Sequence, residues 1–268
     1  MVIEDCDVDS GDDAYVLKSN DPSFTVENVV IRRSVARSSC NFFKLGTASH
    51  GTMRNIRFEM NRCEAPRRSF ISVYDKRDWG RPLAGEEWYY PNRIYGWANG
   101  PDHLAGMAAI AIECVDGGRV ENVVVDGLEA TGAMTPIFVR GGWRMKRSGV
   151  PDAKRGNQNV LKDIVIRNVK AVAESSVASS ITGVEGCRPS NVVLENIDIV
   201  CKGENGKYRP AAVPEHPGRY PEANMFGFTP AYGLYIRHAD GVTLKNVNFH
   251  LGKGRTDSRE AIVREDCR

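Results

Sequence analysis

A short apolar pattern recurs along the chain and indicates repeating β-structure. Each copy is opened by Asn, Asp or Gly and continues with three residues that are mostly β-branched or leucine, as strands require. The copies are Asn28-Val29-Val30-Ile31, Asn55-Ile56-Arg57-Phe58, Asn122-Val123-Val124-Val125, Asp163-Ile164-Val165-Ile166, Asn191-Val192-Val193-Leu194 and Gly241-Val242-Thr243-Leu244. A second series of expected strands covers Ala14–Lys18, Phe42–Leu45, Ala109–Glu113, Pro136–Arg140, Ser180–Gly183 and Gly233–Arg237.

The spacing of the repeat predicts a parallel β-helix, a single-stranded solenoid with inserted loops. The anchors Asn28 and Asn55 are 27 residues apart, and Asp163 and Asn191 are 28 apart. Strands repeated every ~20–30 residues are typical of such solenoids. Asn tolerates left-handed backbone at a corner, so we expect stacked Asn side chains to form a ladder. The sequence shows no leucine framework, which disfavours a leucine-rich repeat. A β-sandwich is the remaining alternative.

The chain is expected to form one domain, residues 1–268, with two long insertions. Residues 66–106 hold three of the four Trp and several Tyr, and aromatic faces stack on sugar rings as well as on each other. Residues 209–228 form an irregular segment with four Pro and the acidic residues Glu215 and Glu222. Loops along one face carry the function of a solenoid, so we expect the insertions to border the site.

Composition excludes several classes of protein. The 268 residues carry 36 Lys and Arg against 34 Asp and Glu, and this balance gives no argument for a nucleic-acid or membrane partner. Uncharged stretches fall well short of the ~20 apolar residues that a membrane span needs. The seven Cys form no CxxC pair, which favours buried free thiols over a metal site or a disulfide framework.

The clearest chemical signal is Asp9-Ser10-Gly11-Asp12-Asp13. Consecutive strand residues point to opposite faces, so two Asp serve one cleft only at a bend, which Gly11 can provide. Two carboxyl groups roughly 6.5–9.5 Å apart can hydrolyse a glycosidic bond with inversion. An ordinary Asp-rich turn is the alternative. A calcium loop is disfavoured because Ser10 and Val16 stand where Gly and Glu are required.

Several segments resemble the polygalacturonase family, glycoside hydrolase family 28, over essentially the whole chain. The most specific runs from Ile3 to Ser19 and contains Asp12 and Asp13. The others are Lys44–Ser49, Ser180–Gly183, Val213–Glu215, Tyr220–Ala223 and Pro230–Arg237. The resemblance implies a right-handed parallel β-helix that hydrolyses pectin-type polysaccharide with inversion, without a metal or other cofactor. It places the proton donor at Asp12 and a residue that activates water at Asp13.

The sequence departs from the family pattern at three places. A further catalytic Asp is expected about twenty residues before the pair, but the chain begins eleven residues before Asp12, so we expect a truncated, weakly active or inactive protein. Ser39-Cys40-Asn41 stands where the family has Gly-His-Gly, and His50 lies too far along to replace that His. Glu113 stands where the family has the Lys of Arg-Ile-Lys. These departures bear on polygalacturonate specificity more than on glycosidase chemistry, because rhamnogalacturonan-cleaving members also lack Gly-His-Gly.

Cations near the ends of the second strand series predict the substrate contacts. If these strands stack, the cations line one column beside the carboxylates, where Arg and Lys suit uronate groups. A solvated basic edge is the alternative. The candidate substrate-binding residues are Lys18, Lys44, His50, Glu113, Arg140, Trp143, Arg144 and Arg237.

The sequence therefore predicts a monomeric glycoside hydrolase that acts on an acidic plant-type polysaccharide, galacturonan or rhamnogalacturonan. The resemblance implies a secreted or periplasmic location. Two other functions stay open: a non-catalytic carbohydrate-binding or adhesive β-helix, and a pectate-lyase-like polysaccharide lyase.

Overall fold

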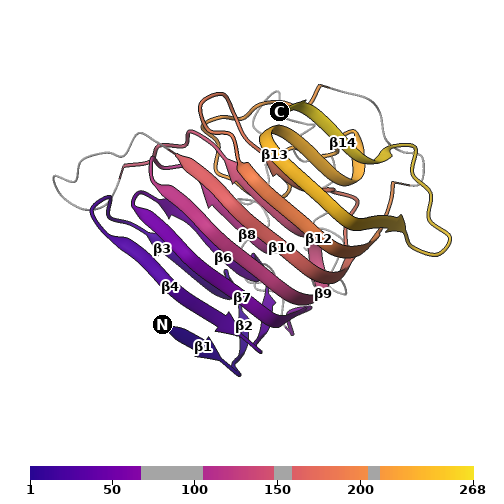
Figure 1. Ribbon diagram of the computed structural model, residues 1–268. Coiled ribbons are helices and arrows are strands. Elements are labelled where there is room, and N and C mark those ends of the chain that lie inside the picture. The colour runs from indigo at the N-terminus through magenta and orange to yellow at the C-terminus, as the bar shows by residue number, and fades with distance from the viewer. Residues whose placement is uncertain (68–104, 148–158, 205–211) are drawn as a thin grey trace, which may run out of the picture.

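A computed structural model describes residues 1–67, 105–147, 159–204 and 212–268, and every regular element in these ranges is a strand (Figure 1). The strands are β1 (Val2–Glu4), β2 (Asp7–Ser10), β3 (Tyr15–Ser19), β4 (Thr25–Arg32), β5 (Val35–Ser38), β6 (Phe43–Ser49), β7 (Thr52–Glu64), β8 (Gly106–Cys114), β9 (Arg119–Gly141), β10 (Val160–Ala173), β11 (Ser179–Thr182), β12 (Ser190–Cys201), β13 (Ala231–Leu251) and β14 (Glu260–Cys267). The predicted all-β class is confirmed.

Neighbouring strands pair in parallel and keep the register that the repeat predicts. Val29 of β4 lies opposite Ile56 of β7, and Ile164 of β10 lies opposite Val192 of β12. Figure 1 shows the strands side by side, with their colours advancing from the N-terminal to the C-terminal part of the chain. Parallel strands need long connections, and several of these connections contain further strands, as β2 and β3 do between β1 and β4 and β11 does between β10 and β12.

The predicted right-handed parallel β-helix, a single-stranded solenoid, is wrong. Five parallel strands form a closed, barrel-like ring, in which β9 pairs with β10, β10 with β12, β12 with β13, β13 with β11, and β11 with β9. Other strands are bonded to the outside of this ring; β7 and β8, for example, pair with β9, and β14 pairs with β13.

The length of two strands explains the difference. The sequence pattern predicted that each strand would be bounded by an Asn, Asp or Gly corner, so the expected strands were four to six residues long. In the structure, strand pairing continues through these corners, so β9 reaches 23 residues and β13 reaches 21. Each of these long strands pairs with β11 through one part and with β10 or β12 through another, which closes the ring.

The predicted ladder of corner side chains is confirmed. The Asn55 amide donates to Asn28 Oδ1 at 3.0 Å, and the Asn122 amide donates to Asn55 Oδ1 at 2.7 Å. Asn28, Asn55 and Asn122 have φ values of 56°, 57° and 54°, which is the left-handed region that Asn tolerates better than most residues. A second ladder joins Asp126, Asn168, Asn196 and Asn246 through amide donors. Single left-handed corners thus turn the chain at matching places in successive strands.

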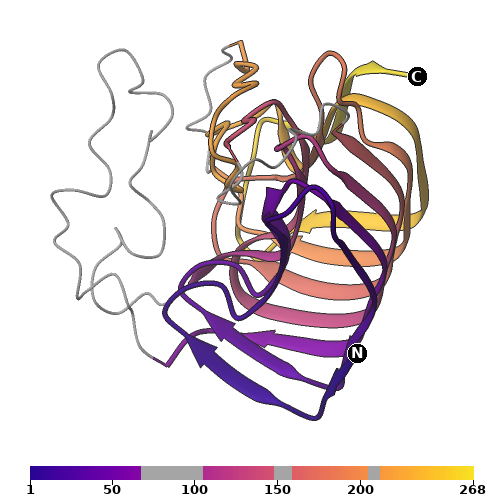
Figure 2. The ribbon, with the colours of Figure 1, turned by 90° about the vertical axis from the view of Figure 1, so that its left-hand side faces the viewer.

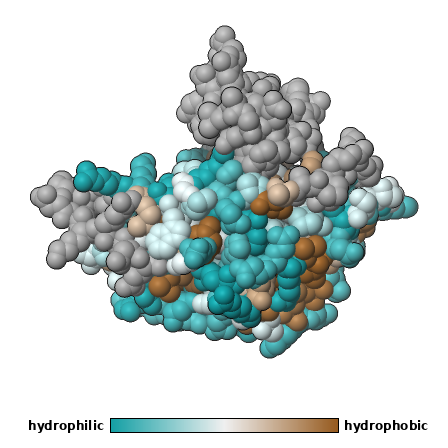
Figure 3. All heavy atoms as spheres, turned by 90° about the horizontal axis from the view of Figure 1, so that it is seen from above, coloured by the Kyte–Doolittle hydropathy of each residue, from teal (hydrophilic) through white to brown (hydrophobic). Residues whose placement is uncertain are grey.

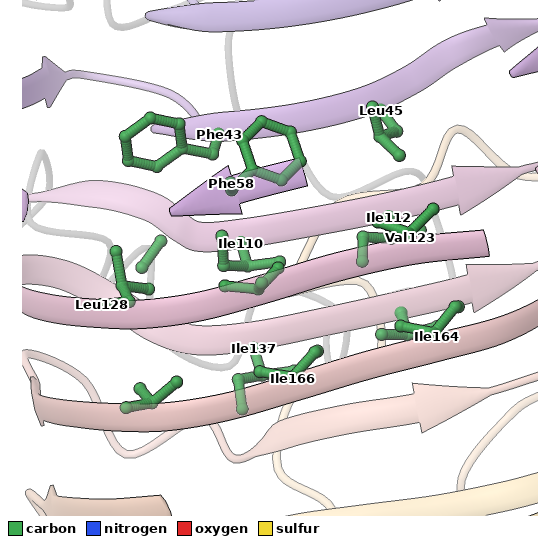
Figure 4. Packing of buried hydrophobic residues seen from close by; sticks show 14 of the residues in the cluster. Phe43, Leu45, Phe58, Ile110, Ile112, Val123, Leu128, Ile137, Ile164 and Ile166 are labelled. Atoms are coloured by element: carbon green, nitrogen blue, oxygen red, sulfur yellow. The ribbon is translucent and has the colours of Figure 1, made fainter. Parts of the chain in front are cut away.

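Apolar side chains of equivalent positions stack to form the core (Figure 4). Leu45 lies opposite Ile112, Ile110 opposite Ile137, and Val123 opposite Ile164, and all of these are fully buried. Figure 2, turned by 90°, shows that strands enclose this core on more than one side. The face seen in Figure 3 is largely hydrophilic, with apolar residues in separate small groups.

The two predicted insertions are only partly described. Most of the aromatic insertion, residues 66–106, and residues 209–211 of the Pro-rich one lie outside the described residues. Residues 212–229, called the covering segment below, contain no strand and pack through Ala223, Met225 and Phe226 on Ala108, Ala111 and Phe138. The covering segment therefore lies over the outer face of β8 and β9.

All seven cysteines have free thiols; the expected burial holds for Cys63, Cys114, Cys187 and Cys201, whereas Cys40 and Cys267 are only partly buried and Cys6 is exposed. Within the described ranges, no helix is long and apolar enough to cross a membrane.

Candidate functional site

The sequence-predicted pair, Asp12 and Asp13, lies in the turn between β2 and β3. Asp12 is exposed, and its Oδ1 accepts the Asp13 main-chain N–H at 2.8 Å. The Ser38 hydroxyl of β5 donates to the Asp12 carbonyl at 2.7 Å. The turn is therefore anchored to the neighbouring strand, and it leaves the two carboxyl groups in different surroundings.

The Asp13 carboxylate receives donors on both oxygens. Oδ1 accepts the Asn41 main-chain N–H at 3.1 Å and the Asn41 side-chain amide at 2.9 Å. Oδ2 lies 3.4 Å from Lys44 Nζ. An ionised carboxylate is an acceptor only, and these contacts match that chemistry.

Lys44 is the centre of a buried charge cluster that we call the Lys44 cluster, and its members are Asp13, Lys44, Glu113 and Glu222. The Lys44 side chain is 1% exposed, and its Nζ lies 3.7 Å from Oε1 of Glu113 on β8. Burial alone would lower the pKa of Lys44, but Glu113, Glu222 and Asp13 together raise it well above its ordinary value. Lys44 is therefore a cation at neutral pH.

Ionisation of both glutamates in this cluster is less favourable than it would be in water. Burial raises the pKa of Glu113 to about 8, although Lys44 acts in the opposite direction. Burial also raises the pKa of Glu222, again opposed by Lys44. The single positive charge of Lys44 faces three carboxyl groups. Burial of negative charges that no cation balances costs free energy. The cluster therefore combines a charged lysine with two glutamates whose ionisation burial makes less favourable.

Several polar atoms around Lys44 lack a hydrogen-bond partner among the described residues. They are both carboxyl oxygens of Glu113, Oε2 of Glu222 and the Thr47 hydroxyl. Gly46 lets the chain pass close to Glu113, because its φ is 110° and a Cβ there would lie 3.0 Å from the Glu113 Cβ. Unsatisfied buried polar groups are rare in folded proteins, and they often mark functional positions.

A basic cleft of about 350 Å³ adjoins this cluster. Its lining is mainly cationic or polar, with one aromatic wall: Lys18, Asn20, Thr47, Ala48, His50, Arg144, Lys146, Arg147 and Tyr220. The Tyr220 ring is shared between the two regions, because the Arg144 guanidinium lies 5.2 Å and Lys44 Nζ 5.7 Å from its centroid. Tyr220 is 49% exposed, so one part of its ring remains open to a ligand.

Asp116, which follows β8, organises the cationic wall. Arg144 Nε donates to Asp116 Oδ1 at 3.0 Å, and a second guanidinium nitrogen contacts Oδ2. The Lys146 main-chain N–H donates to the same Oδ1 at 3.0 Å, and His50 Nε2 lies 3.9 Å from Oδ2. Because Asp116 is completely buried, it fixes Arg144 and the segment after it while the Lys146 and Arg147 side chains stay exposed.

The predicted contacts Arg140 and Arg237 bind the covering segment instead of facing the cleft. The Arg140 guanidinium donates to the carbonyls of Gly183, Glu215 and His216 at 2.9–3.1 Å. That of Arg237 donates to the carbonyls of Val213 and Pro214 at 2.6 and 2.7 Å. Both guanidinium groups lie over the Phe226 ring, and burial lowers the pKa of Arg140 to about 10, with Arg237 adding to the effect.

The structure therefore distributes the predicted residues over several places, of which the covering-segment contacts of Arg140 and Arg237 are one. Lys18, His50 and Arg144 meet in the basic cleft, while Asp13, Lys44 and Glu113 meet in the Lys44 cluster. Trp143 lies apart, where its indole N–H donates to the Glu185 carbonyl at 2.8 Å. Lys44 and Arg140 do not share one column, because their positions along the paired strands differ. Lys44 lies opposite Ala111 of β8, whereas Arg140 lies opposite Glu113, two residues further along the same strand.

Sequence reasoning missed the roles of Asn41, Asp116, Glu222 and Tyr220. The sequence marks Glu222 as an acidic residue of the Pro-rich segment and Tyr220-Pro221-Glu222 as part of a resembling stretch. The place of these residues beside Lys44 depends on the folded path of the covering segment. Among the described residues, no group of three or more His, Cys, Asp or Glu side chains could hold a metal ion.

Comparison of the chain with family models, with curated proteins and with solved structures found no match. The resemblance to glycoside hydrolase family 28 stays a prediction. The functional argument therefore depends on the geometry and chemistry of the Lys44 cluster and the basic cleft.

Proposed function

We propose that this protein is a glycoside hydrolase that cleaves an acidic, pectin-type polysaccharide. The observation that carries the proposal is the Lys44 cluster next to the basic cleft. Hydrolysis of a glycosidic bond needs one carboxyl group that donates a proton and one carboxylate that activates water or attacks the sugar. Asp13, with donors on both oxygens, suits the second role.

The basic cleft supplies the substrate preference in this proposal. Lys18, Arg144, Lys146 and Arg147 surround a volume of about 350 Å³, and Tyr220 offers a half-exposed aromatic face. Arg and Lys bind carboxylates through charge-assisted hydrogen bonds, and aromatic rings stack on sugar faces. A chain of uronic acid residues has both features, so galacturonan and rhamnogalacturonan are the substrates to test first.

A reducing-sugar assay with both polysaccharides tests the proposal. We expect the protein to release reducing ends and Asp13→Asn to lose at least 100-fold in rate, as removal of a general base does. Glu195→Gln is the matched control, because Glu195 lies on β12, outside the Lys44 cluster and the basic cleft. Proton NMR of the first product shows whether the anomeric configuration is inverted.

The other outcomes separate the rival functions. Binding of oligogalacturonides by calorimetry without any release of reducing ends would identify a carbohydrate-binding protein. Products with a new double bond, seen by their ultraviolet absorbance, would identify a lyase. Neither result is expected if Asp13 activates water.

A further inference from the structure

Glu222 contributes the last carboxyl group of the Lys44 cluster along the chain. It belongs to the covering segment, two residues after Tyr220, whose ring forms part of the cleft wall. Glu222 is partly exposed as a residue, but its Oε2 is shielded and has no hydrogen-bond partner in the described part of the chain. The ionisable side chains that interact electrostatically with Glu222 are Asp12, Asp13, Cys40, Lys44, Glu113 and Tyr220.

Glu222 and Asp13 share neighbours, which places the two carboxyl groups close together. The Asn41 amide and the Lys44 ammonium both contact Asp13, and both also favour the ionised form of Glu222. Asn41 is held firmly, since it is buried and its Oδ1 accepts the Ala108 N–H at 3.2 Å. The two carboxyl groups are therefore set around one rigid amide and one buried cation.

The other carboxyl groups suit proton donation less well. Glu113 is completely buried and cannot reach a ligand without rearrangement of the fold. Asp12 is exposed, and its Oδ1 already accepts the Asp13 N–H. A proton donor must remain protonated near neutral pH and still reach the substrate. Burial raises the pKa of Glu222, with Asp13 and Asp12 adding to that effect and Lys44 and Asn41 opposing it.

We propose that Glu222 is a catalytic residue, the general acid that protonates the leaving oxygen, while Asp13 activates the attacking water. This inference rests on the proposed glycosidase function and moves the acid role from Asp12, where the resemblance puts it, to the covering segment. The bond between the anomeric carbon and the leaving oxygen breaks, and that oxygen takes the proton of Glu222. Water forms the new bond to the anomeric carbon and gives a proton to Asp13. Exchange with solvent then restores both groups.

The test compares two substrates of different leaving group. An oligogalacturonide needs protonation of its leaving oxygen, whereas an aryl galacturonide with a nitrophenol leaving group needs little. For Glu222→Gln we expect kcat to fall by about 10²–10⁴-fold on the oligogalacturonide and by less than tenfold on the aryl galacturonide. The decline of kcat/KM at high pH, which reports deprotonation of the acid, should disappear in this variant.

Asp12→Asn tests the rival assignment of the acid, and Glu215→Gln is the control for a substitution in the covering segment. Glu215 lies in the same covering segment, and its carboxylate contacts His238 at 3.1 Å, away from Lys44. Glu215→Gln should leave both rates and the pH profile unchanged. If Glu222→Gln fails to fold, Glu222→Asp retains an acid of shorter reach, and it should keep the high-pH decline with a lower rate on the oligogalacturonide and a nearly unchanged rate on the aryl galacturonide.

The outcomes distinguish this inference from the proposed function. If Asp12→Asn shows the leaving-group signature and Glu222→Gln does not, Asp12 is the acid, and the role of Glu222 is refuted while hydrolysis stands. Equal losses on both substrates with an unchanged pH profile assign Glu222 a structural role and refute the inference. Absence of turnover by the unmodified protein on both substrates overturns the proposed function and the inference together.

Discussion

Oδ2 of Asp13 lies 3.4 Å from Nζ of Lys44, and Lys44 is almost completely buried. This contact connects the turn after β2 to β6, and through Lys44 to Glu113 on β8. A buried ion pair gives little net stability by itself, but removal of one partner leaves the other charge uncompensated. The contact therefore makes the stability of the fold depend on the same residues as the proposed chemistry.

Replacement of Lys44 by Met should destabilise the protein strongly. The variant leaves three carboxyl groups around a buried apolar side chain, and loss of one partner of a buried pair costs about 3–5 kcal/mol. Urea denaturation followed by circular dichroism measures this loss. Lys245→Met is the control, because Lys245 is exposed on β13, and it should change the free energy of unfolding by less than about 0.5 kcal/mol. Equal stability of the two variants would contradict the buried position of Lys44.

The stability contribution of Glu113 should fall as the pH rises. Its pKa is about 8 in the fold and near 4.5 in the unfolded chain, so the folded state binds the extra proton between these values. The contribution is fully present below about pH 4.5 and is lost progressively as the pH approaches 8. The raised pKa of Glu222 acts in the same direction.

Unfolding free energies of the unmodified protein and of Glu113→Gln, measured from pH 5 to pH 9, test this dependence. Glutamine cannot titrate, so the difference between the two proteins should shift steadily in favour of the variant as the pH rises. A difference that stays constant over this range would show that Glu113 does not hold a proton in the fold.

Strain in the left-handed backbone at a ladder corner should add to the stability that is lost with the side-chain hydrogen bonds. Asn55 has a φ of 57° and hydrogen-bonds to Asn28 and Asn122. Asn55→Ala loses these bonds and places a Cβ in a strained conformation, so we expect a loss of about 1–3 kcal/mol. Asn55→Gly loses the same bonds without the strain and should cost less. Thermal unfolding of the two variants measures the order, and a larger loss for Gly would contradict this account.

Charge reversal in the basic cleft should weaken the binding of acidic sugars. Arg147 is exposed and lines the cleft. We expect Arg147→Glu to reduce the affinity for an oligogalacturonide by about tenfold, because a like charge replaces an attractive one at the binding surface. Calorimetry measures this affinity at two salt concentrations. A neutral galacto-oligosaccharide is the control ligand, and an equal loss of its affinity would indicate a structural effect. Lys245→Glu should affect neither ligand.

The corners and strands could be predicted from the sequence, but the closure of the ring could not. Asn28, Asn55 and Asn122 are visible as corner residues because they precede apolar runs, and all three adopt the expected left-handed backbone. Whether pairing stops at a corner is decided by hydrogen bonds to neighbouring strands, and the local pattern does not contain that information. Strands β9 and β13 pass through several corners for this reason, and the predicted solenoid was wrong.

The candidate site was predictable for residues in the acidic turn and on the stacked strands, but not for those that the covering segment brings in. Asp12 and Asp13 share one turn, and their neighbours Lys18 and Lys44 lie on the two strands that pair directly. Glu222 and Tyr220 join them from about 200 residues further along the chain, through the packing of Phe226 and Met225 on β8 and β9. Arg140 and Arg237 carry the expected charge, but main-chain carbonyls of the covering segment occupy their guanidinium groups.

Those two arginines hold the covering segment by groups that every amino acid possesses. The carbonyls of Val213, Pro214, Glu215 and His216 would accept the same hydrogen bonds whatever side chains stood at these positions. Residues 213–216 of the segment are thus attached independently of their own side chains, whereas further along the segment the side chains of Ala223, Met225 and Phe226 supply the packing. Substitutions in it can remodel the wall around Tyr220 and Glu222, and with it the choice of ligand, while β8, β9 and β13 beneath remain unaltered.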